Sequence, residues 1–166
     1  MTHHILISVG SNIDKEHNTL AGLQSLFDVF GELQLSTIYE SESVGFSGNN
    51  FLNLVVSAQT QKSVAEVCEA LKKIEDDSGR VRDKKFGNRT LDLDLLTYDE
   101  LVCDHPVVLP RGEIEYNAFV LKPMAEIVPE HVHPTTGKTY AKLWHDYSNP
   151  QQRLWPTALT WSPDTQ

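Results

Sequence analysis

The chain has 166 residues, of which 40% are hydrophobic, and it carries a formal net charge of −9. This length predicts one domain with a hydrophobic core, and no apolar run is long enough to span a bilayer, so we expect no membrane partner. The excess of negative charge argues against nonspecific binding to nucleic acid, whose phosphates are held mainly by positive charge. At the N-terminus no cationic segment precedes an apolar run, so we expect a cytoplasmic protein.

Strands and helices alternate along the first half of the chain. Apolar residues predict a first strand at residues 5–9, followed by a turn at residues 10–12. Leucines and phenylalanines recur at helical spacing over residues 20–30 and predict a first helix, which ends at Gly31. The chain therefore opens with a strand that leads directly into a helix.

Two more strands and a second helix follow. Polar and apolar residues alternate over residues 33–39 and predict the second strand, and the Gly, Ser and Asn content of residues 40–50 predicts a loop. Residues 51–58 predict the third strand. Ser63 and Glu66 have the spacing of a capping box, which begins the second helix.

The remaining pattern completes the fold prediction. We expect a fourth strand at residues 91–96, a further strand near residues 107–109 and a short helix near Trp144. The order βαββαβ predicts an α+β, ferredoxin-like sandwich, in which an antiparallel sheet has helices on one face, plus a C-terminal extension. We expect residues 1–147 to form a single catalytic domain and residues 148–166 to form a tail packed on it.

The face of the sheet without helices should gather four side chains. Successive strand residues point to opposite faces, so Phe51 and Asn53 share this face with Asp92 and Asp94. Carboxylates at i and i+2 lie only about 7 Å apart and repel each other unless positive charge lies between them. Mg²⁺ would supply that charge, and the cations within residues 80–89 suit a polyphosphate. The alternative is an exposed edge strand with solvated carboxylates; we favour metal and polyphosphate because the acidic pair and the basic loop adjoin.

The segment Lys85-Phe-Gly-Asn-Arg-Thr-Leu-Asp-Leu-Asp-Leu-Leu96 resembles the signature of the 6-hydroxymethyl-7,8-dihydropterin pyrophosphokinases, folate-pathway enzymes that transfer pyrophosphate from ATP to a pterin alcohol. The resemblance extends over residues 5–127. It implies an ATP-dependent diphosphokinase that releases AMP, uses two Mg²⁺ ions, and has ATP and the pterin as its small-molecule partners. We expect it to act as a monomer. No P-loop or dinucleotide motif is present, so side chains and metal must hold the phosphates.

The resemblance also implies a role for each matched residue. The metal ligands would be Asp92 and Asp94, and the catalytic residues would be these two with Arg82 and Arg89. The pterin ring would lie between Phe51 and Phe119, with Asn53 at its edge and the backbone of Ser41, Glu42 and Val44 beside it. The nucleotide would be held by Lys72, Glu75, Lys85, Phe86, Arg89 and Arg111.

The chain departs from the family pattern at four places. The loop at residues 40–43 is acidic and lacks the usual proline. Asn88 stands where a proline or another small residue is usual, Arg111-Gly112 replaces His-Pro, and Asn117 replaces an arginine of the polyphosphate clamp. The alternative function is therefore a diverged paralogue that binds a pterin but transfers pyrophosphate weakly or not at all. A third hypothesis, a ferredoxin-like interaction domain without chemistry, leaves the paired aspartates unexplained.

Overall fold

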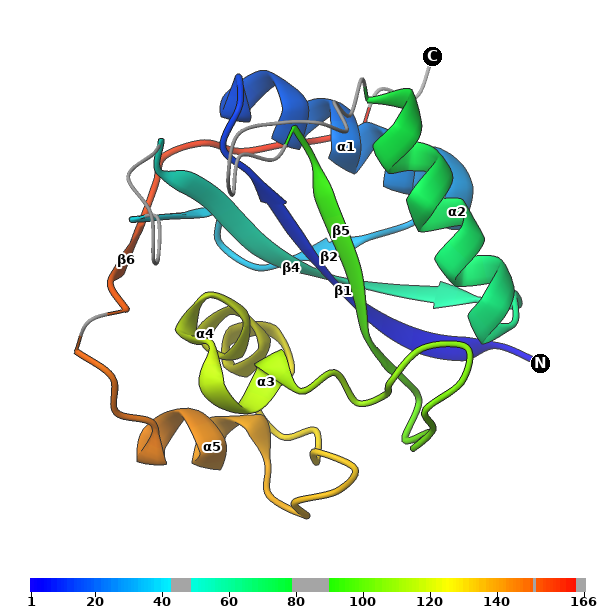
Figure 1. Cartoon of the computed structure of the whole chain (residues 1–166), viewed down its shortest axis with the longest axis vertical. Helices are drawn as coiled ribbons and strands as arrows, with labels where there is room; N and C mark the ends of the chain where they lie inside the picture. Colours follow the sequence, from blue (N-terminus) through cyan, green and yellow to red (C-terminus); the bar gives the residue numbers. More distant parts are fainter. Residues whose placement is uncertain (43–48, 79–89, 151, 164–166) are drawn as a thin grey trace.

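A computed structural model describes residues 1–42, 49–78, 90–150 and 152–163. These residues form a six-stranded sheet with helices on both faces (Figure 1). The elements are, in chain order, β1 (His3–Ser11), α1 (Lys15–Phe30), β2 (Gln34–Leu35), β3 (Tyr39–Ser41), β4 (Phe51–Thr60), α2 (Val64–Asp77), β5 (Asp92–Tyr98), α3 (Glu113–Tyr116), α4 (Ala118–Ile127), α5 (Tyr140–Asp146) and β6 (Leu154–Pro156). None of the helices in the described ranges is long and apolar enough to cross a membrane.

The strands follow the order β5-β1-β4-β3-β6, with β2 paired to β4 beside β3. Every pairing is antiparallel. β1 therefore lies between β4 and β5, and the aspartate strand β5 lies at an edge. This arrangement sets the phenylalanine and asparagine of β4 and the two aspartates of β5 on either side of β1.

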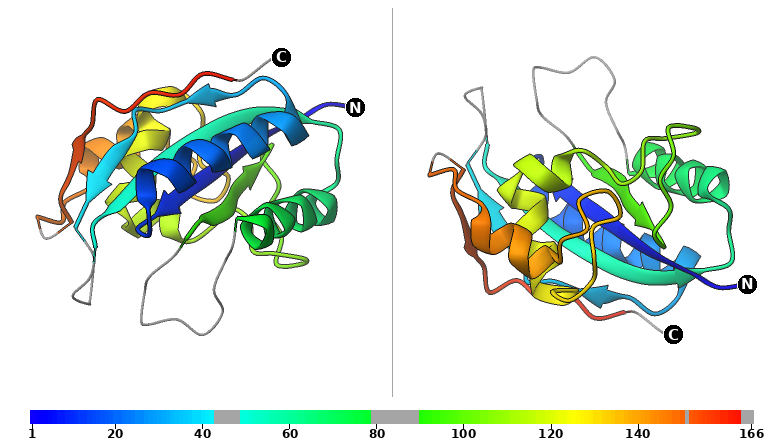
Figure 2. Two further views of the ribbon diagram at one scale, coloured as in Figure 1. Left: turned by 90° about the horizontal axis from the view of Figure 1, so that it is seen from above. Right: turned by 90° about the horizontal axis from the view of Figure 1, so that it is seen from below.

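Helices α1 and α2 cover one face of the sheet and enclose the larger core (Figures 1 and 2). Leu23 and Leu26 of α1 are fully buried there. Gly22 lets α1 approach the start of the aspartate strand, because a Cβ at this position would lie only 2.9 Å from the Leu91 side chain. The predicted capping box of α2 is confirmed: the Ser63 hydroxyl accepts from the Glu66 N–H, and the Glu66 carboxylate accepts from the Ser63 N–H.

A second core lies on the opposite face, beneath the helices of the C-terminal third. Leu6, Val55 and Leu96 of the sheet pack there against buried residues of α3, α4 and α5 and their connections: Ile114, Val120, Leu121, Met124, Val128 and Tyr140. The predicted α+β sandwich with α1 and α2 on one face is confirmed. The other face is not bare along its whole length, because these helices cover the part built from Leu6, Val55 and Leu96.

The predicted second strand is interrupted at Ser36, where a side chain replaces part of the backbone ladder. The Ser36 N–H donates to the Val55 carbonyl at 2.9 Å, and the Ser36 hydroxyl accepts from the Val55 N–H at 3.0 Å. β2 therefore ends at Leu35, and β3 begins at Tyr39. A hydroxyl at one position thus divides the expected strand into two.

Three further predictions of local structure are wrong. Glu40 and Ser41, expected in a loop, belong to β3, which has a strand partner on each edge. Gly10 and Ser11, expected in a turn, continue β1 opposite β4. Residues 107–109 contribute only an isolated bridge between Cys103 and Leu109. The short helix predicted near Trp144 is confirmed as α5.

Candidate active site

The four side chains predicted to share a face meet around Gly10 of β1. In the sheet register Gly10 lies opposite Asn53 on one side and opposite Asp92 on the other. Neighbouring strands are about 4.8 Å apart, so the Asn53 and Asp92 backbones lie roughly 10 Å apart across this glycine. An amide of one strand and a carboxylate of another can therefore contact the same small molecule across Gly10.

Gly10 forms the floor of a small pocket. A Cβ there would lie 3.4 Å from Asn53 Oδ1 and 3.9 Å from Phe51 Cδ1. The pocket is lined by Ser8, Val9, Gly10, Phe51, Asn53, Leu54, Asp92, Asp94, Glu113, Asn117, Phe119 and Val120. It therefore joins the two predicted aromatic residues, the amide and both aspartates in one concave site at the uncovered end of the sheet face.

A hydrogen bond from the neighbouring strand orients the amide of Asn53. Its Nδ2 donates to the Ser41 hydroxyl at 2.7 Å, and Ser41 is fully buried. Phe51 enters the pocket from β4 and Phe119 from α4, and both are half-buried. A flat heterocycle is best recognised by aromatic faces and a few fixed polar groups, which this wall of the pocket supplies.

Asn117, one of the departures from the family pattern, caps the helix that contains Phe119. Its Oδ1 accepts from the Phe119 N–H at 3.0 Å, and its Nδ2 lies 3.5 Å from Glu113 Oε2. An asparagine cap satisfies one of the unpaired N–H groups at a helix start and is typical of this position. The residue that replaces the arginine therefore has a structural role at the edge of the pocket.

Arg111 lies against the aspartate strand and supplies a cation there. Its backbone N–H donates to the Leu96 carbonyl at 3.0 Å, its Nη2 lies 3.3 Å from Asp94 Oδ1, and its Nε donates to Glu113 Oε1 at 2.8 Å. Burial lowers the pKa of Arg111, but the bond to Glu113 and the charges of Asp94, Glu113 and Asp92 outweigh it and shift the pKa upward. The carboxylates of this pocket thus already attract a positive group.

Asp92 and Asp94 suit a hard divalent cation. Both are half-buried on the pocket face of β5, and carboxylate oxygens are the ligands that Mg²⁺ prefers. Among the described residues, no group of three or more His, Cys, Asp or Glu side chains could hold a metal. Mg²⁺ held by one or two carboxylates generally completes its coordination with water and with phosphate oxygens.

Helix α2 contains two residues predicted to hold the nucleotide, and neither lines the pocket. Glu75 is 8% exposed, and its Oε2 accepts from the Leu93 N–H at 2.7 Å, between the two aspartates. It thereby satisfies a backbone donor of an edge strand. Lys72 is exposed on the same helix.

Of the remaining predicted residues, Ser41 is beside Asn53 and Glu42 is exposed at the end of β3. Val44, Arg82, Lys85, Phe86 and Arg89 lie outside the described residues. Sequence reasoning missed Gly10 and Glu113 as parts of the site. Glu113 follows Arg111 by two residues, which was the only local signal for their pairing.

A larger hollow of about 360 Å³ lies at the opposite end of this sheet face, lined by residues that include His4, Asp99, Glu100, His131 and Tyr140. The Asp99 carboxylate there is bound by the His4 N–H and by the His3 ring. This hollow is larger than the pocket at Gly10, but its lining does not include the predicted aromatic, amide and acidic side chains, which converge in the pocket at Gly10. We therefore assign the candidate active site to the smaller pocket.

The chain is similar to known proteins over most of its length. A family model described as 7,8-dihydro-6-hydroxymethylpterin-pyrophosphokinase matches residues 6–129. The chain is 31% identical over 160 residues to 2-amino-4-hydroxy-6-hydroxymethyldihydropteridine pyrophosphokinase of Synechocystis sp., a match that covers 94% of this chain and 81% of that protein. It is 33% identical over 137 residues to the protein of the same name from Aquifex aeolicus, with 81% of this chain and 86% of that protein covered.

Solved structures show the same fold. The chain is similar to an HPPK-DHPS in complex with substrates, with a TM-score of 0.70, 13% identity, and coverage of 89% of this chain and 44% of that one. Wild-type HPPK-DHPS of Plasmodium falciparum gives a TM-score of 0.71 at 12% identity, with 89% and 45% covered. This chain thus spans less than half the length of those two chains, and at such identities the likeness concerns the fold alone. None of the comparisons favours the diverged paralogue.

Proposed function

This chain belongs to the 7,8-dihydro-6-hydroxymethylpterin-pyrophosphokinase family, and we propose that it transfers pyrophosphate from ATP to 6-hydroxymethyl-7,8-dihydropterin and releases AMP, a step of folate biosynthesis. The observation that carries this proposal is the register across Gly10. It sets Asn53 opposite one side of β1 and Asp92 opposite the other. One pocket therefore offers side chains for both substrates, an amide for the heterocyclic alcohol and a carboxylate for the metal-bound polyphosphate.

The pterin occupies the wall formed by Phe51, Asn53 and Phe119. We infer that its ring stacks between the two phenylalanines, and that its edge is bound by the Asn53 amide and by the backbone of Ser41, Glu42 and Val44. The Asn53–Ser41 bond supports this arrangement, because it leaves the Asn53 carbonyl oxygen beside Gly10 in the pocket. An amide that is already oriented loses little conformational entropy when it binds a ligand.

The polyphosphate lies toward β5. We infer that Asp92 and Asp94 hold two Mg²⁺ ions there, and that Arg111, Lys72, Glu75, Lys85, Phe86 and Arg89 contact the nucleotide. The metal, when bound, neutralises phosphate charge and fixes the orientation of the transferred group. The pairing of Arg111 with Asp94 supports a cation-binding role for this aspartate.

In the reaction the pterin hydroxyl oxygen forms a bond to the β-phosphorus of ATP, and the bond from that phosphorus to the α–β bridging oxygen breaks. AMP leaves with the bridging oxygen, and the hydroxyl proton is released to water. Asp92 is the aspartate opposite Gly10, so we assign it to the position beside the hydroxyl. Arg82 and Arg89 stabilise the charge that develops on the transferred group, a task that requires positioning more than covalent chemistry.

Three properties of the chain as a whole belong to this proposal. We infer that it acts as a monomer in the cytoplasm, that residues 1–147 form the catalytic domain, and that residues 148–166 are a tail packed on it. The packing of Leu159 and Trp161 against the larger core supports the last point.

The assignment of Asp94 is tested by Asp94→Ala in the full chain, with Glu130→Ala, an exposed acidic residue outside the pocket, as the control. We expect AMP formation to fall at least about 100-fold in Asp94→Ala, because a metal ligand is lost, and to stay unchanged in the control. The far-ultraviolet circular dichroism spectrum should be the same in both. If Asp94→Ala kept more than about a tenth of the activity, the metal assignment would be wrong.

A further inference from the structure

Residues 152–163 run along the edge of the sheet that is farthest from β5 and reach α1, where Trp161 packs against Phe27 (Figures 1 and 2). We call residues 152–157 the C-terminal strap. It includes β6, which is the outermost strand on this side. The pocket at Gly10 has two walls that suit a heterocycle, Phe51 and Asn53 of β4 and Phe119 of α4, and we call this part the heterocycle pocket. The strap contributes no lining residue, but it contacts α4 itself and β3, whose Ser41 binds Asn53.

The first contact is with β3. β6 pairs with it so that Leu154 lies opposite Ser41, and the other edge of β3 pairs Ser41 with Phe51. Ser41 is the residue whose hydroxyl binds Asn53. Without β6, the outer edge of this three-residue strand would present unpaired N–H and C=O groups and lose one of its two partners. The strap therefore fixes the position from which Ser41 orients the amide of Asn53.

The second contact is with the start of α4. Gln152 Oε1 accepts from the Ala118 N–H at 3.0 Å, and the Tyr147 hydroxyl also contacts this oxygen. Ala118 is the first residue of α4 and precedes Phe119, so the bond satisfies an N–H that has no partner within the helix. Gln152 thus holds the helix end that bears the second phenylalanine of the pocket.

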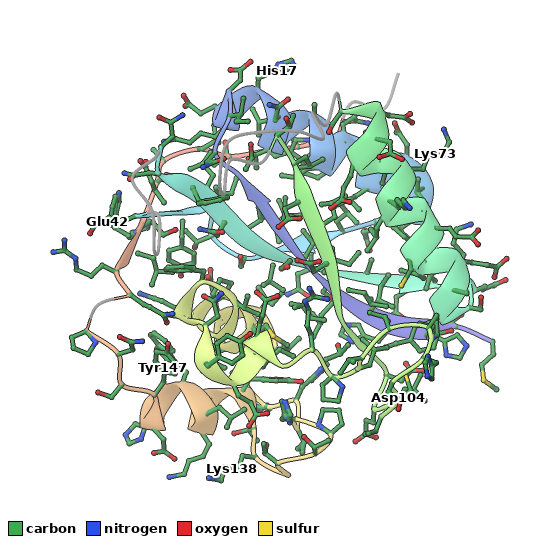
Figure 3. All side chains as sticks on the ribbon, in the orientation of Figure 1. His17, Glu42, Lys73, Asp104, Lys138 and Tyr147 are labelled. Atoms are coloured by element: carbon green, nitrogen blue, oxygen red, sulfur yellow. The ribbon has the colours of Figure 1, made fainter. Side chains whose placement is uncertain are left out.

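The strap is anchored firmly at its far end. The Thr157 N–H and hydroxyl both donate to the Ile38 carbonyl, at 3.0 and 2.8 Å, and the Trp161 ring packs edge-on against Phe27 of α1 at 6.1 Å. The ion pair between Arg153 and Glu42 is exposed, with 71% and 51% of the two side chains accessible, and such pairs contribute little. Figure 3 shows Tyr147 at the end of α5, shortly before the strap begins, and Glu42 near β6, which belongs to the strap.

We propose that the C-terminal strap positions both walls of the heterocycle pocket and thereby sets the affinity for the pterin, independently of the affinity for ATP. Gln152 is a positioning residue, which acts through Ala118 on Phe119. This inference rests on the proposed function, because it assigns the pocket to the pterin. It gives the tail a role that neither its sequence nor its packing on the core implies.

The test compares Gln152→Ala and Gln152→Glu in the full chain, with Gln61→Ala, an exposed glutamine between β4 and α2, as the control. Affinities are measured by calorimetry for 6-hydroxymethyl-7,8-dihydropterin and, separately, for α,β-methylene-ATP with Mg²⁺. Removing the acceptor in Gln152→Ala should raise the Kd for the pterin about tenfold and change the Kd for the ATP analogue less than about twofold. Gln152→Glu keeps an acceptor at a helix N-terminus and should stay within about threefold of wild type for both.

Amide hydrogen exchange gives a readout that needs no ligand. In Gln152→Ala, peptides from the start of α4 should exchange faster, whereas peptides from α2 should not change. The strap proposal would be wrong if Gln152→Ala bound the pterin as tightly as wild type, or if it lost affinity for the pterin and for the ATP analogue equally. Neither result would contradict the proposed function. If the wild-type chain bound no pterin, the proposed function would fail, and the strap proposal would fail with it.

Discussion

Arg111 departs from the family pattern and places a cation beside the aspartate strand. The family pattern has His-Pro at this place, and the chain has an arginine whose guanidinium lies between Asp94 and Glu113. All three side chains are roughly one-third exposed or less, so their attraction is screened less than on an open surface. A metal ion that binds Asp94 must compete with this internal cation. We propose that Arg111, once displaced from Asp94, contacts phosphate while its Nε remains bound to Glu113.

This competition predicts that Arg111→Ala binds Mn²⁺, used as a probe for Mg²⁺, about three- to tenfold more tightly than wild type when no nucleotide is present. Electron paramagnetic resonance of free Mn²⁺ measures this affinity directly. Lys142→Ala, which removes an exposed cation from α5, is the matched control and should leave the affinity unchanged. The same Arg111→Ala variant should bind α,β-methylene-ATP more weakly. Equal Mn²⁺ affinity in Arg111→Ala and wild type would show that Arg111 does not compete for the aspartate.

At the scale of elements, carboxylates of two helices hold β5 and β3 in place. α2 holds the edge strand β5 through Glu75 and Leu93. α4 holds β3 through Glu126, whose carboxylate accepts from the Thr37 N–H, the Thr37 hydroxyl and the Tyr39 hydroxyl at 3.0, 2.7 and 2.8 Å. In both contacts a carboxylate accepts hydrogen bonds from donors at places where the backbone pairing between strands is short or interrupted.

The contact between Tyr39 and Glu126 should make stability depend on alkaline pH. Burial, together with the hydrogen bond to Glu126 and its charge, raises the pKa of Tyr39 to about 12. The pKa of tyrosine in an unfolded chain is about 10. The contact therefore contributes its full stabilisation below about pH 10, and this contribution is lost as the pH rises toward about 12. Urea unfolding should show that Tyr39→Phe is less stable than wild type by about 1 kcal/mol at pH 8. The difference should shrink at pH 11.

Tyr116→Phe is the control for this titration, because its side chain is 63% exposed. It should follow wild type at both pH values. Tyr140, whose pKa burial raises to about 12, remains in every variant and contributes the same loss to each. If Tyr39→Phe and wild type lost stability in parallel between pH 8 and 11, the proposed contribution of Tyr39 would be wrong.

The sequence was sufficient to predict elements whose signals are local. The capping box at Ser63 and the alternation in β4 and β5 each reflect contacts within a few residues. The extension of β3 through Glu40 and Ser41 was not predicted, because the Gly, Ser and Asn residues that follow are typical of a loop. Its outer partner β6 lies more than one hundred residues later and contains a proline. A proline is tolerated in such an outer strand and conceals it in the sequence.

The candidate site shows the same division. Alternation placed Phe51, Asn53, Asp92 and Asp94 on one face, and the structure brings them to one pocket. The floor at Gly10 depends on β1 lying between β4 and β5, which is a property of strand order and not of any segment. The cap formed by Asn117 was also hidden, because comparison with the family pattern marked the residue only as a lost cation.

At the scale of the molecule, the sheet separates two cores and leaves the site at the end of the less covered face. The larger core lies beneath α1 and α2, and the smaller core beneath α3, α4 and α5. The pocket at Gly10 adjoins the smaller core, so α4 can present Phe119 to it while β5 presents the aspartates. The net charge of −9 disfavours an anionic substrate at long range, which makes local cations and metal necessary for ATP binding.

The most direct test of the proposed pyrophosphate transfer is the release of AMP from ATP and Mg²⁺, measured with and without 6-hydroxymethyl-7,8-dihydropterin. AMP and the pyrophosphorylated pterin should form in equal amounts, and neither should form when the pterin is omitted. If the chain bound the pterin but formed no AMP, the proposed transfer would be wrong, and the diverged paralogue would be favoured.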